Sequence, residues 1–371
     1  MDYQSIFDPI ANVLGVLMKY IYITVAFENY GVAIILFTLL TRLLLLPLNI
    51  KQSKSMAKMQ RIQPELKELQ AKYKYDKEKL NQATMELYKR HQVNPAGGCL
   101  PLLVQMPLLF SLYYVIRQPL KFMFRFSPEK IQGIGDHILS VLQATEGKEA
   151  EYAEYSKFFY LNGEKFSHMN ADLPIIRYFT SLGDRMAAAI AEMTASTGLI
   201  LDPAHIINMD FLGIKLGETP TISTAKITAE PGIYLPLLLI PIFAALTTYL
   251  ASKTAQTSPS SGGAGGMGKG MTYLFPGMTM LFTFSLPAGL GLYWIAGNII
   301  QMVQQKFMKK HIDKKEEELK FVEEEKMKNE AQERQKLIEQ REFDKDVLRK
   351  ANVSKKKMKN IMDKEKKQKK S

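Results

Sequence analysis

The chain has 371 residues, of which 46% are hydrophobic and 23% are charged, and its formal net charge is +12. These averages resemble those of a soluble protein, but hydrophobic and charged residues occupy separate blocks of the sequence. The apolar runs lie at 31–48, 99–120, 232–251 and 271–303, and the lysine clusters lie at 51–90 and 306–370. A soluble globular enzyme interleaves core and surface residues, so this segregation excludes that class and indicates a membrane protein with water-exposed insertions.

The first 29 residues are expected to form an external segment that contains an interfacial helix. Residues 6–27 are apolar, but Asp8, Asn12 and Lys19 interrupt them. This pattern favours an amphipathic helix lying in the membrane interface over a membrane crossing. The terminus also lacks the basic region that is typical of a cleaved signal peptide.

Five later runs are apolar enough for transmembrane helices, which need about 20 residues each. The sequence therefore predicts an all-α polytopic membrane protein with a five-helix transmembrane bundle, its spans at 30–50, 98–120, 231–251, 271–287 and 288–307. Prolines inside these runs are compatible with a membrane bundle, where neighbouring helices satisfy the freed carbonyl groups. We do not assign a crossing to the weaker run at 186–201, because it would place the lysine-rich tail outside the cell.

The distribution of charge predicts how the chain is oriented in the membrane. Residues 43–97 hold 11 Lys and Arg against 5 Asp and Glu, whereas residues 120–230 hold 10 against 14. Basic segments stay on the cytoplasmic side. We therefore expect an external N-terminus, a cytoplasmic segment at 51–97, an external region at 121–230, a cytoplasmic Gly/Ser-rich loop at 252–270 and a cytoplasmic tail at 308–371.

The segment after the first span is expected to be a helical hairpin. Apolar residues recur at spacings of three and four from Met59 to Tyr73 and again from Leu80 to His91, on either side of a polar turn at 73–78. Two such helices form an antiparallel coiled-coil hairpin. Asp76 is suited to cap the second helix, and Pro64 to a kink or restart in the first. Periodicity alone leaves open whether the hairpin is a docking arm or a solvated surface.

The tail at 308–371 alternates acidic and basic blocks, and its last 21 residues hold nine lysines against two acidic residues. Such a composition does not bury a core of its own. Two interpretations therefore stay open: a solvated, partly helical extension that also touches anionic lipid head groups, or an electrostatic arm that binds ribosomal RNA.

Arg42 is the most informative residue of the first span. A cation near the middle of an apolar span costs about 2.5–3.5 kcal/mol, so such residues usually face a partner or a water-filled cavity. Arg42 lies nine residues before the basic flank at Lys51, which is roughly 13 Å along a helix at 1.5 Å per residue. At this depth an arginine side chain would not readily extend to the cytoplasmic head groups. No acidic residue occurs in any predicted span. A wet, positively charged cavity is therefore predicted.

Polar side chains of two other spans are candidate walls of that cavity. Gln105 lies in the second span, and Trp294, Asn298, Gln301 and Gln305 share one face of the fifth. The plainer interpretation is that these side chains form hydrogen bonds between helices. The single Cys99 and the five dispersed histidines match no zinc or catalytic motif, so neither a metal, a cofactor nor an enzymatic reaction is expected.

Four stretches resemble the YidC-type membrane protein insertases of the YidC/Oxa/Alb family: TRLLLLPL at 41–48, NPAGGCLPLLVQMPLLFSLYYVI at 94–116, FLGIKLG at 211–217 and LPAGLGLYWIAGNIIQMVQQ at 286–305. The resemblance implies a hydrophilic groove closed on the outside, in which Arg42 holds the family's arginine position. It implies nascent membrane proteins and membrane lipids as partners, the ribosome as a partner of the tail, and a Sec translocon as a further candidate. The chain lacks the large periplasmic domain and the lipobox cysteine of some members.

Two other functions are compatible with the residues taken alone. A small-solute transporter or channel is disfavoured by the odd number of spans and by the single intramembrane charge. A membrane receptor that tethers ribosomes without inserting proteins would need only the tail.

Overall fold

The computed structural model describes residues 4–93, 100–161, 164–165, 171–255 and 267–308, and within the tail residues 325, 327–330 and 332–336. The chain divides into two compact units, Met1–Met308 and Lys309–Ser371. Among the described residues the only strands are four strands of two residues each, which form two antiparallel pairs. The expected all-α class is therefore confirmed. The described tail residues are helical. Most of the Gly/Ser-rich loop, the segment 94–99 and the remaining tail lie outside the described residues.

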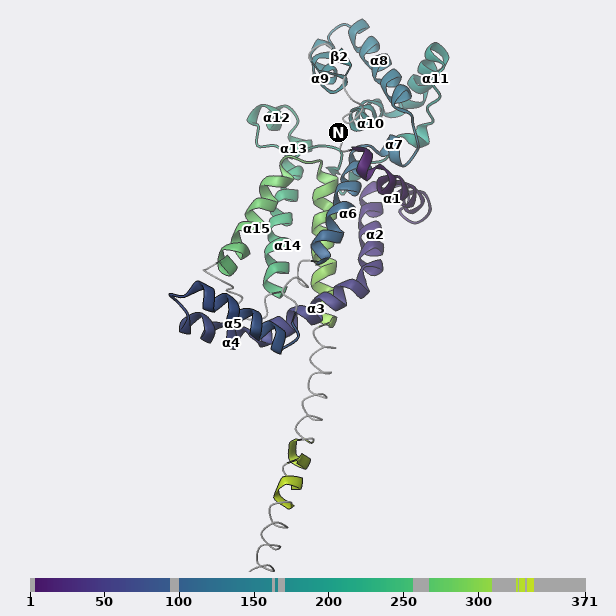
Figure 1. Ribbon diagram of the computed structural model, residues 1–371. Helices are drawn as coiled ribbons and strands as arrows, with labels where there is room; N and C mark the ends of the chain where they lie inside the picture. Colours follow the sequence, from purple (N-terminus) through teal and green to yellow (C-terminus); the bar gives the residue numbers. More distant parts are fainter. Residues whose placement is uncertain are drawn as a thin grey trace, which may run out of the picture. The chain divides into compact units, whose positions relative to one another are not determined.

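Five helices run lengthwise beside one another in the first unit (Figure 1): α2 (Tyr30–Leu44), α6 (Leu100–Arg117), α14 (Leu239–Ala255), α15 (Met267–Thr283) and an unlabelled light green helix at 288–308. The short helix α13 (Pro231–Leu237) leads into α14. Within the described residues, length and composition qualify Ile6–Thr24 and Pro231–Thr254 as membrane spans, and α2 with the next helix as a third. The number of five crossings therefore stays a prediction.

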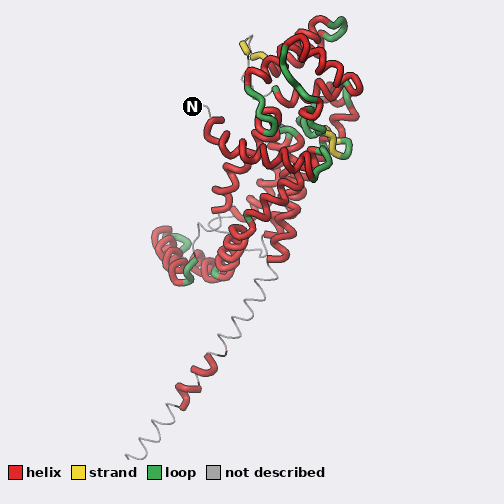
Figure 2. Tube along the Cα trace, turned by 90° about the vertical axis from the view of Figure 1, so that its right-hand side faces the viewer, coloured by secondary structure: helices red, strands yellow, loops and turns green. Residues whose placement is uncertain are grey.

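The first helix, α1 (Gln4–Thr24), lies across the lengthwise helices. Figure 1 shows it nearly end-on, and Figure 2 shows it running sideways from the marked N-terminus. One face of α1 is buried by Ala11, Leu14 and Met18, whereas Val13 and Tyr20 on another face are exposed. The helix is long and apolar enough to cross a membrane, but its direction is the one expected of a helix that lies along a membrane surface.

The chain bends by 59° between α2 and α3 (Leu46–Arg61), and the break falls at Leu45. Pro47 explains the break, because its ring lacks an N–H group and clashes with the preceding helical turn. The bend directs α3 away from the lengthwise helices and toward the hairpin (Figure 1).

The hairpin consists of α4 (Gln63–Lys72) and α5 (Lys77–Arg90). Pro64 lies in the first turn of α4, which confirms the predicted restart after α3. The Asp76 carboxylate accepts a hydrogen bond from the Lys79 N–H at 3.0 Å, which confirms the predicted cap of α5. A small apolar core joins the two helices through Ile62, Leu66, Leu87 and Val93.

The residues between α6 and α13 form a mainly helical subdomain. It lies beyond one end of the lengthwise helices, and the hairpin lies at the other end (Figures 1 and 2). Its main helices pack around Ile134, Ile138, Phe159 and Phe179. The 12-residue α11 is too short to cross a membrane, in line with the absence of a predicted span at 186–201. The subdomain comprises α7 (Pro119–Phe122), α8 (Pro128–Ala144), α9 (Glu149–Phe159), β1 (Tyr160–Leu161), β2 (Glu164–Lys165), α10 (Asp172–Ser181), η3 (Gly183–Arg185), α11 (Met186–Thr197), η4 (Pro203–His205), β3 (Asp210–Phe211), β4 (Ile214–Lys215) and α12 (Thr224–Ala229).

A fully buried carboxylate, that of Asp172 in α10, joins α10 to the short helix α7 within this subdomain. The Oδ2 atom of Asp172 accepts a hydrogen bond from the Lys121 N–H at 3.1 Å, while its Oδ1 atom is buried without a hydrogen-bond partner. Burial raises the pKa of Asp172 to about 7, although the N–H groups of Lys121 and Leu120 lower it. The folded protein therefore holds the protonated form of Asp172 up to neutral pH.

We predict that Asp172 makes the folded protein less stable as the pH rises from 4 to 8. Its folded pKa lies above the ordinary value of 3.8, so the stabilisation is fully present below pH 4 and is lost as the pH passes through 7. In Asp172→Asn the amide imitates the protonated acid. The melting temperature of the parent protein in detergent should therefore fall relative to that of Asp172→Asn across this range.

The exposed Asp184 of η3 supplies a matched control, Asp184→Asn, whose melting curve should run parallel to that of the parent at every pH. Parallel curves for Asp172→Asn as well would contradict the raised pKa.

Candidate functional site

Arg42 lies in the last turn of α2, three residues before the break at Leu45. Its side chain is half-buried, and within the described residues no carboxylate lies at ion-pair distance from it. The guanidinium lies against the helix at 288–308, where a Cβ atom added to Gly297 would be 3.0 Å from Nη2. Glycine at this position thus gives the guanidinium the room to approach the neighbouring helix backbone.

A second contact joins the same two helices. The Gln304 side chain donates a hydrogen bond from Nε2 to the main-chain carbonyl of Arg42 at 3.2 Å. That carbonyl is among the last four of α2, which have no partner within the helix. Gln304 therefore stabilises the end of α2 close to the bend.

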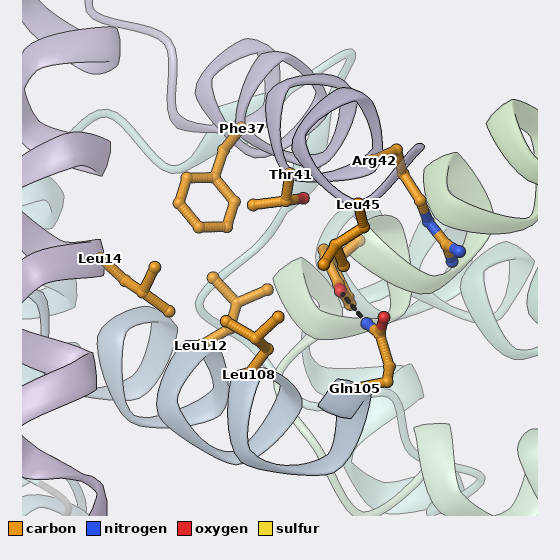
Figure 3. A pocket seen from close by; sticks show the side chains of 9 residues that line it. Leu14, Phe37, Thr41, Arg42, Leu45, Gln105, Leu108 and Leu112 are labelled. Atoms are coloured by element: carbon orange, nitrogen blue, oxygen red, sulfur yellow. Dashed lines mark hydrogen bonds between the residues drawn. The ribbon is translucent and has the colours of Figure 1, made fainter. Parts of the chain in front are cut away.

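A cavity adjoins Arg42 between α1, α2, α6 and the helix at 288–308. Its empty volume is about 280 Å³, counting space that is open to solvent. Figure 3 shows the apolar side chains on one side and Gln105 on the other, with the Arg42 guanidinium pointing away from Phe37 and Leu14. Gln105 donates a hydrogen bond to the Tyr293 hydroxyl at 3.0 Å. The cavity is lined by Leu14, Phe37, Thr41, Arg42, Leu45, Gln105, Leu108, Leu112 and Tyr293.

The structure brings together only part of the predicted set. Arg42 and Gln105 line the cavity, whereas Trp294, Asn298 and Gln301 do not. The buried Asn298 side chain instead donates hydrogen bonds to the hydroxyls of Thr247 and Thr248 in α14, at 3.2 and 2.9 Å. This contact corresponds to the plainer interpretation of the polar stripe, a hydrogen bond between helices.

Three residues of the helix at 288–308 that contact Arg42 or line its cavity are absent from the predicted set: Tyr293, Gly297 and Gln304. They lie one position before Trp294, Asn298 and Gln305, so the face turned toward Arg42 is rotated by about 100° from the predicted one. Two adjacent faces of this helix carry polar residues, so polarity alone does not favour one face over the other. A clue was available in Gly297, because glycine inside a helix often marks a close approach.

The end of the bundle nearest the helical subdomain is joined to the strands β3 and β4. The Tyr30 N–H donates to the Asn208 carbonyl at 3.0 Å, and the Phe211 ring fills the space where a side chain on Gly31 would lie. The N–H groups of Ala288 and Gly289 donate to carbonyls of the same segment at 2.8 and 2.9 Å. These main-chain contacts hold α2 and the helix at 288–308 together at this end.

An ion-pair network reinforces the same end. Arg177 of α10 lies 3.1 Å from Glu154, 3.3 Å from Glu218 and 3.5 Å from Glu230. Burial raises the pKa of Glu218, and the Arg177 guanidinium opposes that rise. Arg177 itself has a raised pKa, because the attraction of Glu218 and Glu154 outweighs the effect of burial. Glu154 lies in α9, Glu218 follows β4, and Glu230 directly precedes α13. The Arg177 guanidinium therefore connects three separate segments.

Comparison with known proteins agrees with this architecture. The family model described as 60Kd inner membrane protein matches residues 22–316. The membrane protein insertase YidC of Clostridium perfringens (strain 13 / Type A) is 33% identical over 316 residues, which cover 82% of this chain and 92% of that protein. The chain belongs to the YidC family.

Other YidC proteins are similar over shorter stretches. The membrane protein insertase YidC of Fusobacterium nucleatum subsp. nucleatum is 29% identical over 282 residues, or 76% of this chain and 87% of that protein. The protein of the same name from Geobacter sp. (strain M21) is 50% identical over 107 residues, which cover only 20% of its length. The resemblance to YidC-type insertases seen in the sequence is therefore confirmed, and the chain is a membrane protein of a family of insertases, not of enzymes.

Proposed function

We propose that the chain is a membrane protein insertase, which helps nascent transmembrane segments to enter the bacterial cytoplasmic membrane. The YidC proteins of C. perfringens and F. nucleatum carry that name. The observation that carries the proposal is Arg42, a half-buried cation in an apolar helix, beside a cavity and without a carboxylate partner among the described residues.

The proposed mechanism is physical and needs no covalent step. A client helix enters the bilayer only if its polar flanking residues cross hydrocarbon, which costs several kcal/mol for each unsatisfied group. A wet groove that reaches partway into the membrane shortens this crossing. Arg42 attracts an acidic outward-going segment, and the apolar client helix then partitions sideways into lipid.

We assign Arg42 and Gln105 to the client-binding groove and add Tyr293, which binds Gln105. Trp294 and Gln301, both half-buried, stay proposed groove residues. The hydrogen bonds of Asn298 to α14 favour a different task for that residue, holding two helices of the bundle together.

The proposed orientation places α1 and the helical subdomain outside the cell and the hairpin and tail in the cytoplasm. It rests on the basic excess of 43–97 and of the tail, and on the separation of hairpin and subdomain at opposite ends of the lengthwise helices (Figure 1). In this orientation the end joined by β3, β4 and Arg177 faces outward, which favours a groove that opens to the cytoplasm.

We expect a membrane-impermeant maleimide to distinguish the two sides. In a Cys99→Ser background, the exposed Ser140 of α8 changed to cysteine should react from outside intact cells. Cysteines at the exposed Met85 of α5 and at Ser354 of the tail should react only after permeabilisation. Labelling of either cytoplasmic position from outside would overturn the orientation.

The central prediction concerns Arg42 and the charge of its clients. If Arg42 supplies attraction to a wet groove, Arg42→Lys should retain most insertion, whereas Arg42→Ala and Arg42→Glu should slow an acidic client by about tenfold, as expected for about 1.4 kcal/mol of lost attraction. A matched client with a neutral outward segment should change much less. The measurement is protease protection of both clients in liposomes that contain only this protein and lipid.

Further outcomes of the same experiment separate the alternatives. Asn298→Ala, at equal levels of folded protein, should leave the ratio of acidic to neutral insertion unchanged. Solute flux without protected client would indicate a transporter, and ribosome binding without protection a tether. Insertion in these liposomes would also show that a Sec translocon is not required, while equal insertion of both clients by Arg42→Ala would refute the groove-charge mechanism.

We propose that the tail binds the ribosome through its charge. Removing 351–371 takes away nine lysines and two acidic residues, a net charge of +7. Ribosome affinity should fall, and the binding that remains should depend less steeply on salt, because fewer counterions are released. An unchanged salt slope would leave the tail without a ribosomal role and favour its contact with lipid head groups.

A further inference from the structure

Three basic side chains gather where the start of the helical subdomain packs along α1. The loop between α7 and α8 runs beside the helix: the Arg125 guanidinium donates to the Asn12 side chain at 3.0 Å, and the Lys19 ammonium lies 5.2 Å from the centre of the Phe124 ring. Asn12 and Lys19 are seven residues apart, about 10 Å along α1. Lys130, in the first turn of α8, is the third basic residue.

Aromatic rings connect the two lysines. The His205 ring lies between Phe124 and Phe126, with centroid distances of 4.8 and 5.0 Å. The Lys130 ammonium lies over the Phe126 ring, 3.5 Å from its centre. The row Lys19, Phe124, His205, Phe126 and Lys130 thus has a cation at each end, and the rings hold both side chains in place.

The positive charge of this row is not neutralised by an ion pair. Within the described residues, Lys19, Arg125 and Lys130 have no carboxylate at ion-pair distance. Asp202 is the acid whose charge acts on His205, and its side chain accepts the Ala204 N–H at 2.8 Å. Glu129 is the exposed neighbour of Lys130 in α8 and has an interaction of its own. The cluster therefore keeps an excess of positive charge.

The central histidine is prepared to donate a hydrogen bond. Burial lowers the pKa of His205; Asp202 raises it, and Lys130 and Lys19 lower it further, which favours the neutral ring. Its Nδ1 atom accepts the Asp202 N–H at 3.1 Å, which leaves the proton on Nε2. The row therefore offers an N–H donor between two cations.

An exposed apolar stripe of α1 borders the cluster. Val13, Tyr20 and Ile23 recur at helical spacing and are at least half exposed, and Phe27 just beyond the helix is 91% exposed. Phe27 has a φ of 52°, an uncommon conformation for a bulky side chain. A basic cluster beside an apolar stripe matches a ligand with an anionic head and acyl chains.

We propose that Lys19, Arg125, Lys130 and His205 bind the phosphate head group of an anionic phospholipid of the outer leaflet, whose acyl chains lie along the exposed stripe of α1. The inference rests on the proposed function, whose orientation places α1 outside the cell, and on the interfacial position expected of α1. The stripe favours a lipid over free phosphate, because a soluble anion would gain nothing from the adjoining apolar surface.

The test places a fluorescent reporter next to the cluster. With Trp294→Phe removing the native tryptophan, Tyr20→Trp is measured in phosphatidylcholine nanodiscs that carry a small fraction of spin-labelled phosphatidylglycerol or, separately, spin-labelled phosphatidylcholine. The anionic lipid should quench the reporter more strongly. Lys19→Gln with Lys130→Gln should abolish this preference, each lysine contributing about fivefold, as expected for ~1 kcal/mol per basic residue at a membrane surface.

Two matched variants control for charge and folding. The first is the double variant Lys148→Gln with Lys157→Gln, which removes one lysine from α9 and one from the turn before it and should keep the preference for the anionic lipid. The second, Lys19→Arg with Lys130→Arg, keeps both positive charges and should also keep the preference. Equal quenching by both lipids in the parent would overturn the head-group site while leaving α1 in the interface. No quenching by either lipid would contradict the interfacial position as well, and loss of the preference in inorganic phosphate would indicate a free-anion site.

Discussion

The need to hold one positive charge among apolar helices governs the geometry of the bundle around it. A cation in a span is costly unless water or polar groups solvate it. Here Gly297 lets the Arg42 guanidinium approach the helix at 288–308, and Gln304 binds the Arg42 carbonyl from the same helix. Gln105 and Tyr293 supply polar groups across the cavity. Arg42 is therefore accommodated by small and neutral polar residues, which leave its charge uncompensated.

The two ends of the bundle are joined by different kinds of contact. Near the helical subdomain, main-chain hydrogen bonds from Tyr30, Ala288 and Gly289 and the ion pairs of Arg177 join segments that are far apart in the sequence. At the other end, α2 breaks at Leu45 and α3 turns away by 59°. The cavity beside Arg42 lies closer to the bent end than to the end joined by β3 and β4, which is the arrangement that the proposed mechanism needs.

Local signals in the sequence predicted local structure well. Asp76 and Pro64 define the ends of the hairpin helices through contacts within a few residues, and Arg42 is evident from its apolar neighbours alone. The rotation of the last long helix was not predictable, because Tyr293 and Gln304 on one face compete with Asn298 and Gln301 on the next. The network around Arg177 was equally hidden, since its partner Glu218 lies 41 positions further along the chain and is brought close only by the tertiary fold.

On the proposed mechanism, the magnitudes favour release of a client without any input of chemical energy. Two unit charges 4 Å apart attract by about 1–4 kcal/mol between bulk water and a protein surface. At about 25 cal/mol per Å² of apolar surface, burying roughly 40–160 Å² offsets that attraction. One aromatic side chain buries about 150–250 Å², so a client helix of 20 apolar residues gains far more by moving into lipid than it loses by leaving Arg42. A carboxylate placed beside Arg42 would reverse this balance, because it would bind the guanidinium permanently and leave no charge to attract a client.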